Sequence, residues 1–512
     1  MAQPDVVIGL DIGTTSTIAA AVSLPDRILA VAGRPVTLSS PHAGWAEEDP
    51  AQWWDNAVAV LREVVAEVTP GRIAGICVTG MLPAVVLLDA DGRVLRPSIQ
   101  QSDGRCGAEV AELAAELDEA QFLRRTGNGI NQQLLAAKLR WLARHEPEVF
   151  SRIATVFGSY DYINWRLTGV RAVEQNWALE AGFTDLATGR IADDLVALAG
   201  IGRAAVPQRS VSHERMGRVT AEAAALTGLP AGTPVFGGAA DHIVSALGAG
   251  ITGAGDVLLK FGGAGDIVVA TDRPLPDPRL FLDYHLVPGL YAPNGCMASS
   301  GSALNWLGGL ITPEAGLEKP HQMLDALAAA IPPGSDGLIC LPYFLGEKTP
   351  IHDPLARGTF VGLGLNHSRG HLWRAVLEAV AFGFRHHIDV LRDIGHAPRR
   401  YIASDGGSRS QVWMQIVADV LGAPVTLLDN HHGSSVGAAF VAAMGTGLAT
   451  DWQEVTRLSR LGATLTPSPS AMPTYDEGYA RYRELYLRLA PYFHGEKLGA
   501  GTGSHAWRPN GA

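Results

Sequence analysis

The sequence predicts an α/β protein built from two halves. Its 512 residues exceed what one ordinary hydrophobic core accommodates, which favours at least two domains. Two similar segments, Val6–Val22 and Asp256–Thr271, each place a glycine-containing turn between two apolar runs. Between and after these segments, helical and strand patterns alternate. We therefore expect one strand–turn–strand unit near the start of each half, and a junction between the halves within 247–255.

Local signals predict the individual helices and strands. Asp49 followed by Pro50 is typical of a helix start, because it supplies a capping acceptor and then a proline at the first helical position. Apolar spacing extends this helix through Val68. Apolar runs and periodicity predict further elements, which are buried strands over 73–79 and 85–88 and helices over 372–394 and 410–421.

Composition and charge narrow the functional classes. Hydrophobic residues make up 47% of the chain and the net charge is −11, which favours large cores and argues against a broad nucleic-acid-binding face. The N-terminus lacks the basic region of a secretory signal, and no long apolar stretch is uninterrupted enough to predict a membrane span. We expect a soluble cytoplasmic protein without nucleic-acid or membrane partners, and a disordered tail over 495–512.

The two glycine turns are candidates for phosphate binding. The first turn contains Gly13, Thr14 and Thr15, and the second contains Gly262 and Gly263. Glycine permits close approach of the backbone, and N–H groups in such a turn can bind an anion. Either turn alone is better explained as an ordinary hairpin. Their matching positions in the two halves favour phosphate binding.

Two acids stand beside these turns or at the junction of the halves. Asp11 directly precedes the first turn, where a carboxylate could hold Mg²⁺ next to phosphate oxygens or could merely cap the turn. Asp241 follows an apolar run and a Gly-Gly pair, where it could accept the proton of a hydroxyl group. Asp241 is equally explained as the N-cap of a helix beginning at His242, and the two roles are compatible.

A third glycine pair, Gly406 and Gly407, precedes the predicted helix over 410–421. Glycines there would let a flat base or a ribose lie against the backbone. A plain helix-entry loop explains the same pattern.

These features occur together with a longer series of motifs in a fixed order. The motifs are LDIGTTS at 10–16, GWAEEDPAQWW at 44–54, LLDADGRVLRPSI at 87–99, SDGRC at 102–106, AKLRWLARHEPEVF at 137–150, DYINWRLTG at 161–169, LPYFLGEKTPIHDPLARGTFVGL at 341–363, SDGGSRSQVWMQIVADVLGAPV at 404–425 and SVGAAFVAA at 435–443. In this order and at these separations the chain resembles the FGGY carbohydrate kinases, and within them the xylulokinases, over residues 8–492.

The resemblance implies two actin-like, ribonuclease H-like ATPase domains, over 1–248 and 249–494, with an interdomain cleft. It implies ATP-dependent phosphorylation of a hydroxyl of a small sugar, a pentulose first of all, and a homodimer is among the expectations. It also implies roles for single residues: Asp241 as the catalytic base, Asp11 near Mg²⁺, Gly13, Thr14, Thr15, Gly262 and Gly263 at the ATP phosphates, Gly406 and Gly407 at the adenosine, and the helix over 436–443 behind the nucleotide.

The chain differs from the family at positions where side chains are expected to contact the sugar. The positions expected to contact the substrate are Leu82, Pro83, Asp103 and His242. Three residues near the expected sugar differ from the family: xylulokinases carry histidine at the position of Pro83, tryptophan at that of Gln101 and asparagine at that of His242. Such changes alter which hydroxyl pattern is accepted. A kinase for another ketose, a polyol or a sugar acid therefore stays open, as does a non-catalytic sugar- or nucleotide-binding regulator. Asp405 also stands where the family often has glycine.

Overall fold

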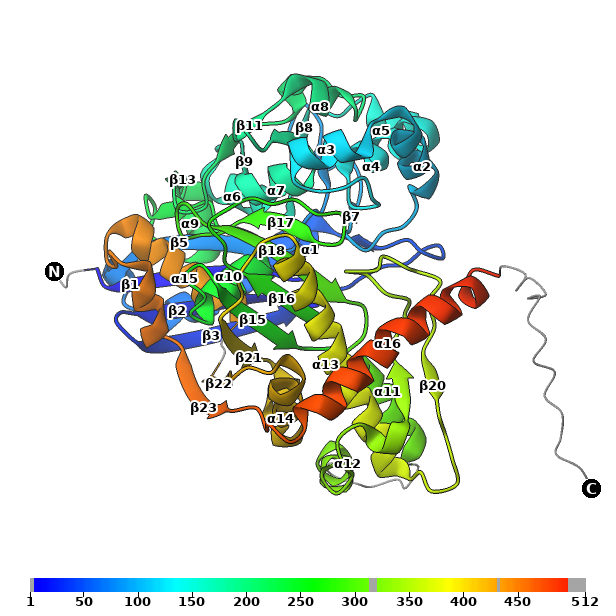
Figure 1. The fold of residues 1–512 in the computed structure, drawn as a ribbon. Helices are drawn as coiled ribbons and strands as arrows, with labels where there is room; N and C mark the ends of the chain where they lie inside the picture. Colours follow the sequence, from blue (N-terminus) through cyan, green and yellow to red (C-terminus); the bar gives the residue numbers. More distant parts are fainter. Residues whose placement is uncertain (1–3, 313–319, 431–432, 496–512) are drawn as a thin grey trace, which may run out of the picture.

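Two β-sheets form the centre of the structure, a computed structural model that describes residues 4–312, 320–430 and 433–495 (Figure 1). Within these residues the first sheet has the strand order β13 (Arg215–Arg218), β14 (Pro234–Phe236), β5 (Ile73–Gly80), β1 (Val6–Ile12), β2 (Ser16–Ser23) and β3 (Arg27–Pro35). The second has the order β17 (Phe281–Tyr284), β18 (Tyr291–Met297), β16 (Gly265–Val269), β15 (Asp256–Phe261), β21 (Arg400–Ser404), β22 (Val425–Asn430) and β23 (Arg460–Leu465).

The two sheets repeat one arrangement of strands. β1 pairs antiparallel with β2 and parallel with β5, and β15 pairs in the same two ways with β16 and β21. Each tight turn of glycine and small residues lies between the antiparallel pair, as the sequence predicted. Asp11 and Lys260 occupy the same place in the repeat, one residue before the end of the first strand. The predicted α/β fold with two actin-like halves is confirmed.

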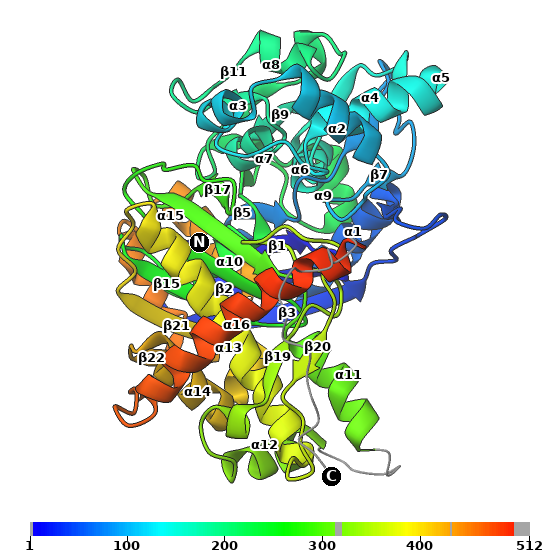
Figure 2. The same ribbon diagram turned by 45° about the vertical axis from the view of Figure 1, so that its right-hand side comes forward.

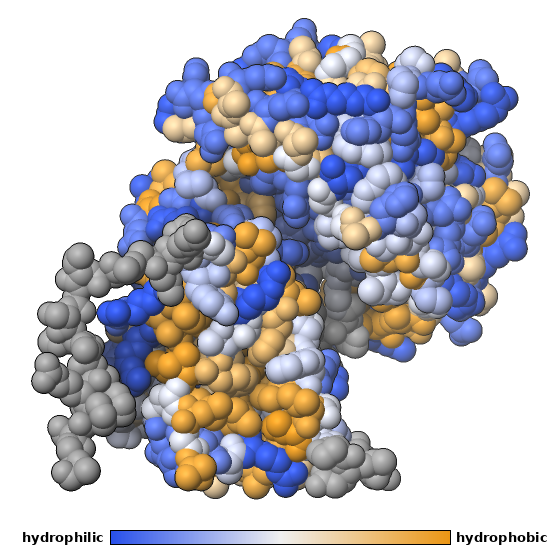
Figure 3. Space-filling view, turned by 90° about the vertical axis from the view of Figure 1, so that its right-hand side faces the viewer, coloured by the Kyte–Doolittle hydropathy of each residue, from blue (hydrophilic) through white to orange (hydrophobic). Residues whose placement is uncertain are grey.

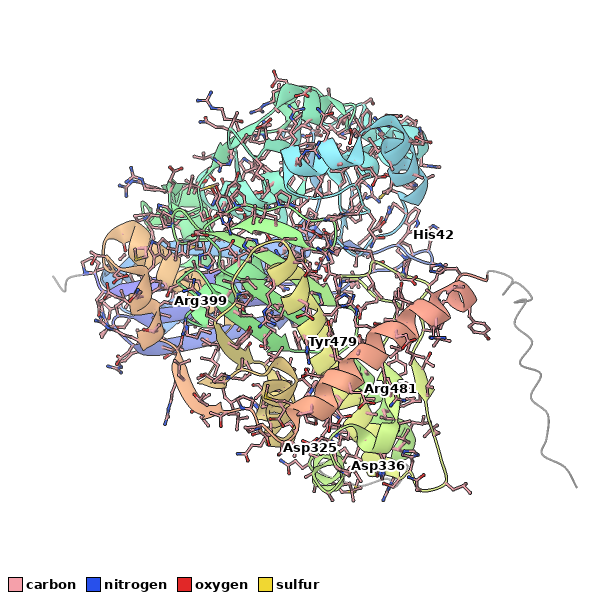
Figure 4. All side chains as sticks on the ribbon, viewed as in Figure 1. His42, Asp325, Asp336, Arg399, Tyr479 and Arg481 are labelled. Carbon is pink, nitrogen blue, oxygen red and sulfur yellow. The ribbon has the colours of Figure 1, made fainter. Side chains whose placement is uncertain are left out.

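The helices cover both sheets and begin close to their predicted positions. α1 (Pro50–Ala66) begins after Asp49, whose carboxylate accepts a hydrogen bond from the Ala51 N–H at 2.8 Å, and it ends two residues earlier than predicted. α13 (Arg369–Asp393) and α14 (Gln411–Leu421) correspond to the other two predicted helices. α16 (Met472–Phe493) crosses α13, and the Tyr479 and Phe382 rings are 6.0 Å apart (Figure 4).

One helix from late in the chain belongs to the core of the first half. α15 (Gly433–Thr446) packs on β1 and β5 and against α10 (Asp241–Gly248). The approach is close because Gly9 has no side chain: a Cβ at Gly9 would lie 1.7 Å from the Ser435 carbonyl oxygen. The division at 248/249 therefore stays a prediction, since α15 lies beyond it and yet packs in the first core.

The helical part of the first half forms a separate lobe at the top of Figures 1 and 2, above β17. Its elements include α2 (Gly107–Glu116), α3 (Glu119–Thr126), α4 (Leu135–His145), α5 (Pro147–Phe150), α7 (Gln175–Glu180) and α8 (Asp193–Ala197), with short strands β6 (Val86–Leu88), β7 (Ser98–Ile99) and β8 (Thr155–Phe157). Next to the first sheet, α6 (Ser159–Thr168) packs on β5 and α9 (Ala221–Thr227) packs on α1. The lower lobe adds α11 (Gly301–Ile311), α12 (Pro320–Ala329), β19 (Ile339–Leu341) and β20 (Thr359–Val361).

Figure 3 shows a hollow between the two lobes and apolar residues gathered on the lower lobe. Large exposed apolar side chains occur on α11, in the loop after β19 and directly after β20, namely Trp306, Leu310, Leu345, Leu363 and Leu365. The expectation of a homodimer stays a prediction. In the described parts of the chain, helices of bilayer-spanning length and apolar character are absent. The tail predicted to be disordered lies, beyond Gly495, outside the described residues.

Candidate active site

A cavity of about 280 Å³ lies between the two halves. The first half contributes Met81, Leu82, Gln101, Gln133, Glu180, Asp241 and His242 to its lining. The second half contributes Lys260, Ala264, Asp266, Ile267, Val268, Phe281, Asn294, Gly295, Cys296 and Lys348. Ionisable side chains from both halves therefore meet around one space of small-molecule size.

Asp241 is the first residue of α10 and lines this cavity. Its Oδ1 atom accepts a hydrogen bond from the His242 N–H at 2.6 Å. The N-cap is Ala240, so the alternative in which Asp241 caps a helix beginning at His242 is wrong by one residue. Burial acts to raise the pKa of Asp241, but the adjacent His242 and then Lys260 lower that pKa below its ordinary value. The structure thus favours an ionised carboxylate that can accept a proton.

Asp11 lies at the end of β1, and its side chain is almost fully buried. Ser434 of α15 donates a hydrogen bond to Oδ2, whereas Oδ1 has no hydrogen-bond partner. Burial, and next the nearby charge of Asp241, raise the pKa of Asp11 to about 7. A buried carboxylate oxygen without a partner is a suitable ligand for a hard divalent cation.

Lys260 supplies a positive charge at the equivalent place in the second half. Its Nζ atom lies 3.6 Å from an Asp266 carboxylate oxygen across the hairpin. Burial acts to lower the pKa of Lys260, but the charges of Asp266, Asp405 and Asp241 raise it above its ordinary value. Lys260 therefore stays protonated at neutral pH and faces the cavity that Asp241 also faces.

The structure places the predicted nucleotide turns on the two hairpins. Gly13, Thr14 and Thr15 form the β1–β2 turn, which the Gly13 N–H closes by donating to the Ser16 carbonyl at 3.0 Å. Gly262 and Gly263 form the β15–β16 turn, and their carbonyl oxygens accept N–H groups from the start of α11.

The predicted adenosine loop lies next to the second turn. A Cβ at Gly262 would be 3.5 Å from a carboxylate oxygen of Asp405. Gly407 is required for packing, because its Cβ would lie 2.5 Å from the Trp413 ring and 2.7 Å from Phe261. Gly406 has open space where its Cβ would project, which leaves room for a ligand at this position.

Of the four predicted substrate contacts, the structure brings two to the cavity. Leu82 and His242 line it, whereas Pro83 and Asp103 do not. The Asp103 carboxylate is fully buried and accepts hydrogen bonds from the Ala46 N–H and, in two places, from the Arg105 guanidinium. Sugar contact by Pro83 and Asp103 stays a prediction without support from this geometry.

Several cavity residues were missed by reasoning from the sequence. The clearest is Glu180, the last residue of α7, which is 8% exposed. Burial, and next the charge of Asp283, raise the pKa of Glu180 well above its ordinary value. Glu180 is the one acid in the otherwise uncharged segment QNWALE. Because acids are rarely buried without a specific partner, this acid could have been chosen from the sequence as a candidate site residue.

Asp405 adopts a backbone conformation that favours glycine, with φ at 72° and ψ at −172°. We expect Asp405→Gly to raise the free energy of unfolding by about 1 kcal/mol, because relief of backbone strain outweighs the added flexibility of the unfolded chain. Thermal denaturation would measure this gain. Asp272→Gly is the control, since Asp272 is exposed and outside the left-handed region; equal effects in both variants would contradict the strain.

Comparison with known proteins identifies the family. Residues 6–248 match the N-terminal domain and residues 262–446 the C-terminal domain of the FGGY family of carbohydrate kinases. The solved structure of xylulose kinase from Rhodospirillum rubrum is 66% identical, with a TM-score of 0.92 over 96% of this chain and 100% of that one. Two proteins of Escherichia coli are each 30% identical: a xylulose kinase, over 94% of this chain and 99% of its own, and an L-xylulose/3-keto-L-gulonate kinase, over 94% and 97%. The chain therefore belongs to the FGGY family of carbohydrate kinases and is a sugar kinase, as its sequence predicted.

Proposed function

We propose that this enzyme transfers the γ-phosphoryl group of ATP to a hydroxyl of a pentulose, with Asp241 as the general base. The observation that carries the proposal is the position of Asp241 in the cavity shared by both halves, with its pKa held low by His242 and Lys260. A carboxylate in this state can accept the proton of a substrate hydroxyl during attack on phosphorus.

The transfer is an in-line displacement at the γ-phosphorus. The substrate oxygen forms a bond to phosphorus as the bond to the β–γ bridging oxygen breaks, so ADP leaves with that electron pair. The hydroxyl proton moves to the Asp241 carboxylate. Lys260, protonated at the mouth of the second turn, stabilises negative charge on the phosphates.

The nucleotide lies, in this proposal, along the three glycine segments. The backbone of Gly13–Thr15 and of Gly262–Gly263 binds phosphate oxygens, and the adenosine lies by Gly406 and Gly407. Mg²⁺ fits Asp11, whose Oδ1 atom is buried without a hydrogen-bond partner. When bound there, the cation would neutralise part of the phosphate charge.

The relatives favour a pentulose substrate, whereas the residues that line the cavity favour a second candidate. The relatives named xylulose kinase favour a pentulose. A second candidate, another ketose, a polyol or a sugar acid, is favoured by Gln101 and His242, which line the cavity and stand where xylulokinases carry tryptophan and asparagine. The name of one relative includes 3-keto-L-gulonate, a sugar acid that fits this second candidate, beside the pentulose L-xylulose.

A substrate panel tests the proposal. The purified protein is incubated with Mg²⁺ and ATP and with ketopentoses, tetruloses, polyols or sugar acids, while ADP release is followed and the product is confirmed by mass. Turnover of a pentulose with the highest kcat/KM supports the proposal. Preference for a polyol or a sugar acid moves the function to the second candidate. Binding of ATP without transfer to any panel member would favour the regulator.

Asp11 gives the metal-free protein a pH-dependent stability. In the unfolded chain its pKa is near the ordinary 3.8, whereas burial raises the folded value to about 7. The stability from the protonated form is complete below pH 4 and is lost as the pH rises to about 7. We expect Asp11→Asn to be more stable than the parent at pH 8, by on the order of 4 kcal/mol, and about equal to it at pH 4.

Thermal denaturation at pH 4, 6 and 8 without divalent cations measures this difference. Asp26→Asn is the control, because Asp26 is exposed in the turn between β2 and β3. A difference between Asp11→Asn and the parent that stays constant with pH would disprove the prediction.

A further inference from the structure

His242 lies between two carboxylates. Its Nδ1 atom is 3.5 Å from Asp241 Oδ1, and its Nε2 atom is 2.9 Å from Asp283 Oδ2. Asp241 precedes it on α10, whereas Asp283 belongs to β17 of the other half. Each ring nitrogen therefore has an acidic partner, and both can donate only if the ring carries both protons.

Asp283 is fixed in its place by further contacts. Its side chain is fully buried, and its Oδ2 atom also accepts a hydrogen bond from Asn294 Nδ2 at 3.0 Å. Three polar side-chain atoms lie within 4.8 Å of one another, one each from Glu180, His242 and Asp283. The side chains of Glu180, His242, Asp283 and Asn294 thus form one polar cluster beside the proposed base, and they come from α7, α10, β17 and β18.

We propose that His242 is a positioning residue: a doubly protonated imidazolium, held by Asp283, that orients the Asp241 carboxylate toward the substrate hydroxyl. Nε2 is hydrogen-bonded with Asp283 and Nδ1 lies at ion-pair distance from Asp241, so both ring nitrogens face carboxylates of the protein. The inference rests on the proposed role of Asp241 as the base, and it replaces hydrogen bonding to the sugar as the function of His242.

The charges around the ring agree with this assignment. Burial acts to lower the pKa of His242, but Asp241 and Asp283 raise it to about 10. Burial and the charge of Asp283 raise the pKa of Glu180, which faces Asp283, well above its ordinary value. Two further ionisable groups act on Asp241. Lys260 on β15 favours the ionised form of Asp241, whereas the carboxyl group of Asp11 on β1 opposes it. Asp266 on β16 lies beside Lys260.

The ring can be observed directly in the ligand-free protein by NMR of ¹⁵N-labelled histidine. The His242 signals are assigned by their loss in His242→Asn. We expect both ring nitrogens to remain protonated up to pH 8. In Asp283→Asn the ring loses one acidic partner, so its titration midpoint should fall by at least one pH unit. A neutral His242 at pH 7, or an unchanged midpoint in Asp283→Asn, would overturn the assignment.

Kinetics supply a second readout, with the pentulose that turns over best as the probe. His242→Asn removes the positive charge and leaves Asp241 buried near Asp11, so the acid limb of kcat/KM should move up by about one pH unit. His42→Asn is the matched control, since His42 is exposed and lies at the edge of the molecule (Figure 4). An acid limb in His242→Asn that coincides with that of the parent would overturn the positioning role.

The two proposals fail in different ways. Near-normal turnover by Asp241→Asn would remove the base itself. Loss of turnover in Asp241→Asn together with an unshifted acid limb in His242→Asn would keep the base and remove only His242 as its positioning residue.

Discussion

Asp241→Asn is expected to reduce kcat by about 10²- to 10⁴-fold, the range for loss of a positioned general base. The amide has nearly the same shape as the carboxylate but cannot accept the hydroxyl proton. Because Asp241 is the first residue of α10 and not part of either glycine turn, affinity for ATP should change by less than about threefold. Steady-state kinetics and calorimetric titration with ATP measure the two quantities separately.

Asp193→Asn is the matched control for this variant. Asp193 is likewise the first residue of its helix, α8, but it is exposed and outside the cavity. Its kcat should equal that of the parent. A similar loss in both variants would indicate a general effect of removing an acid from a helix start and would contradict the assignment of Asp241 as the base.

Gly9→Ala is expected to lower the free energy of unfolding by about 3 kcal/mol or more, at the upper end of the cost of overpacking. The new Cβ would lie 1.7 Å from the Ser435 carbonyl oxygen and 2.5 Å from the Ala439 nitrogen. Both are backbone atoms of α15, so the whole helix must move away from β1. The movement would also carry Ser434 away from Asp11, and kcat/KM should fall together with stability.

Gly33→Ala separates this effect from the ordinary consequences of adding a methyl group to a strand. Gly33 lies in β3 of the same sheet, and the nearest atom to its Cβ would be 3.7 Å away, an ordinary contact. Thermal denaturation of both variants gives the comparison. If Gly9→Ala unfolds at the same temperature as Gly33→Ala, α15 does not pack on β1 as described.

The features that could be predicted from the sequence depend on neighbouring residues. The hairpin of β1 and β2 and the hairpin of β15 and β16 each lie within one short segment, in which apolar runs and glycines specify strand and turn. The start of α1 follows in the same way from Asp49 and Pro50, because an N-cap bonds within its own first turn. The repeat of these local patterns was sufficient to predict two similar halves.

The rest of the site depends on residues far apart in the chain. Ser434 bonds to Asp11 across 423 positions, and no local pattern relates them. Glu180 and Asp283 come together only because α7 packs against β17. Asp103 was predicted to bind substrate from its place in a motif, yet Arg105 and the Ala46 N–H occupy its carboxylate. Such contacts require the tertiary fold, which periodicity and spacing do not supply.

The packing of α15 on β1 and β5 has a consequence for folding during synthesis. The strands of the first sheet are complete once Phe236 has left the ribosome, but the helix that covers one of its faces begins only at Gly433. Until then Gly9 and its apolar neighbours in β1 face solvent or a temporary partner, although N-terminal domains generally fold first. The first half therefore reaches its native core only after most of the second half has been made, and the two halves mature as one unit.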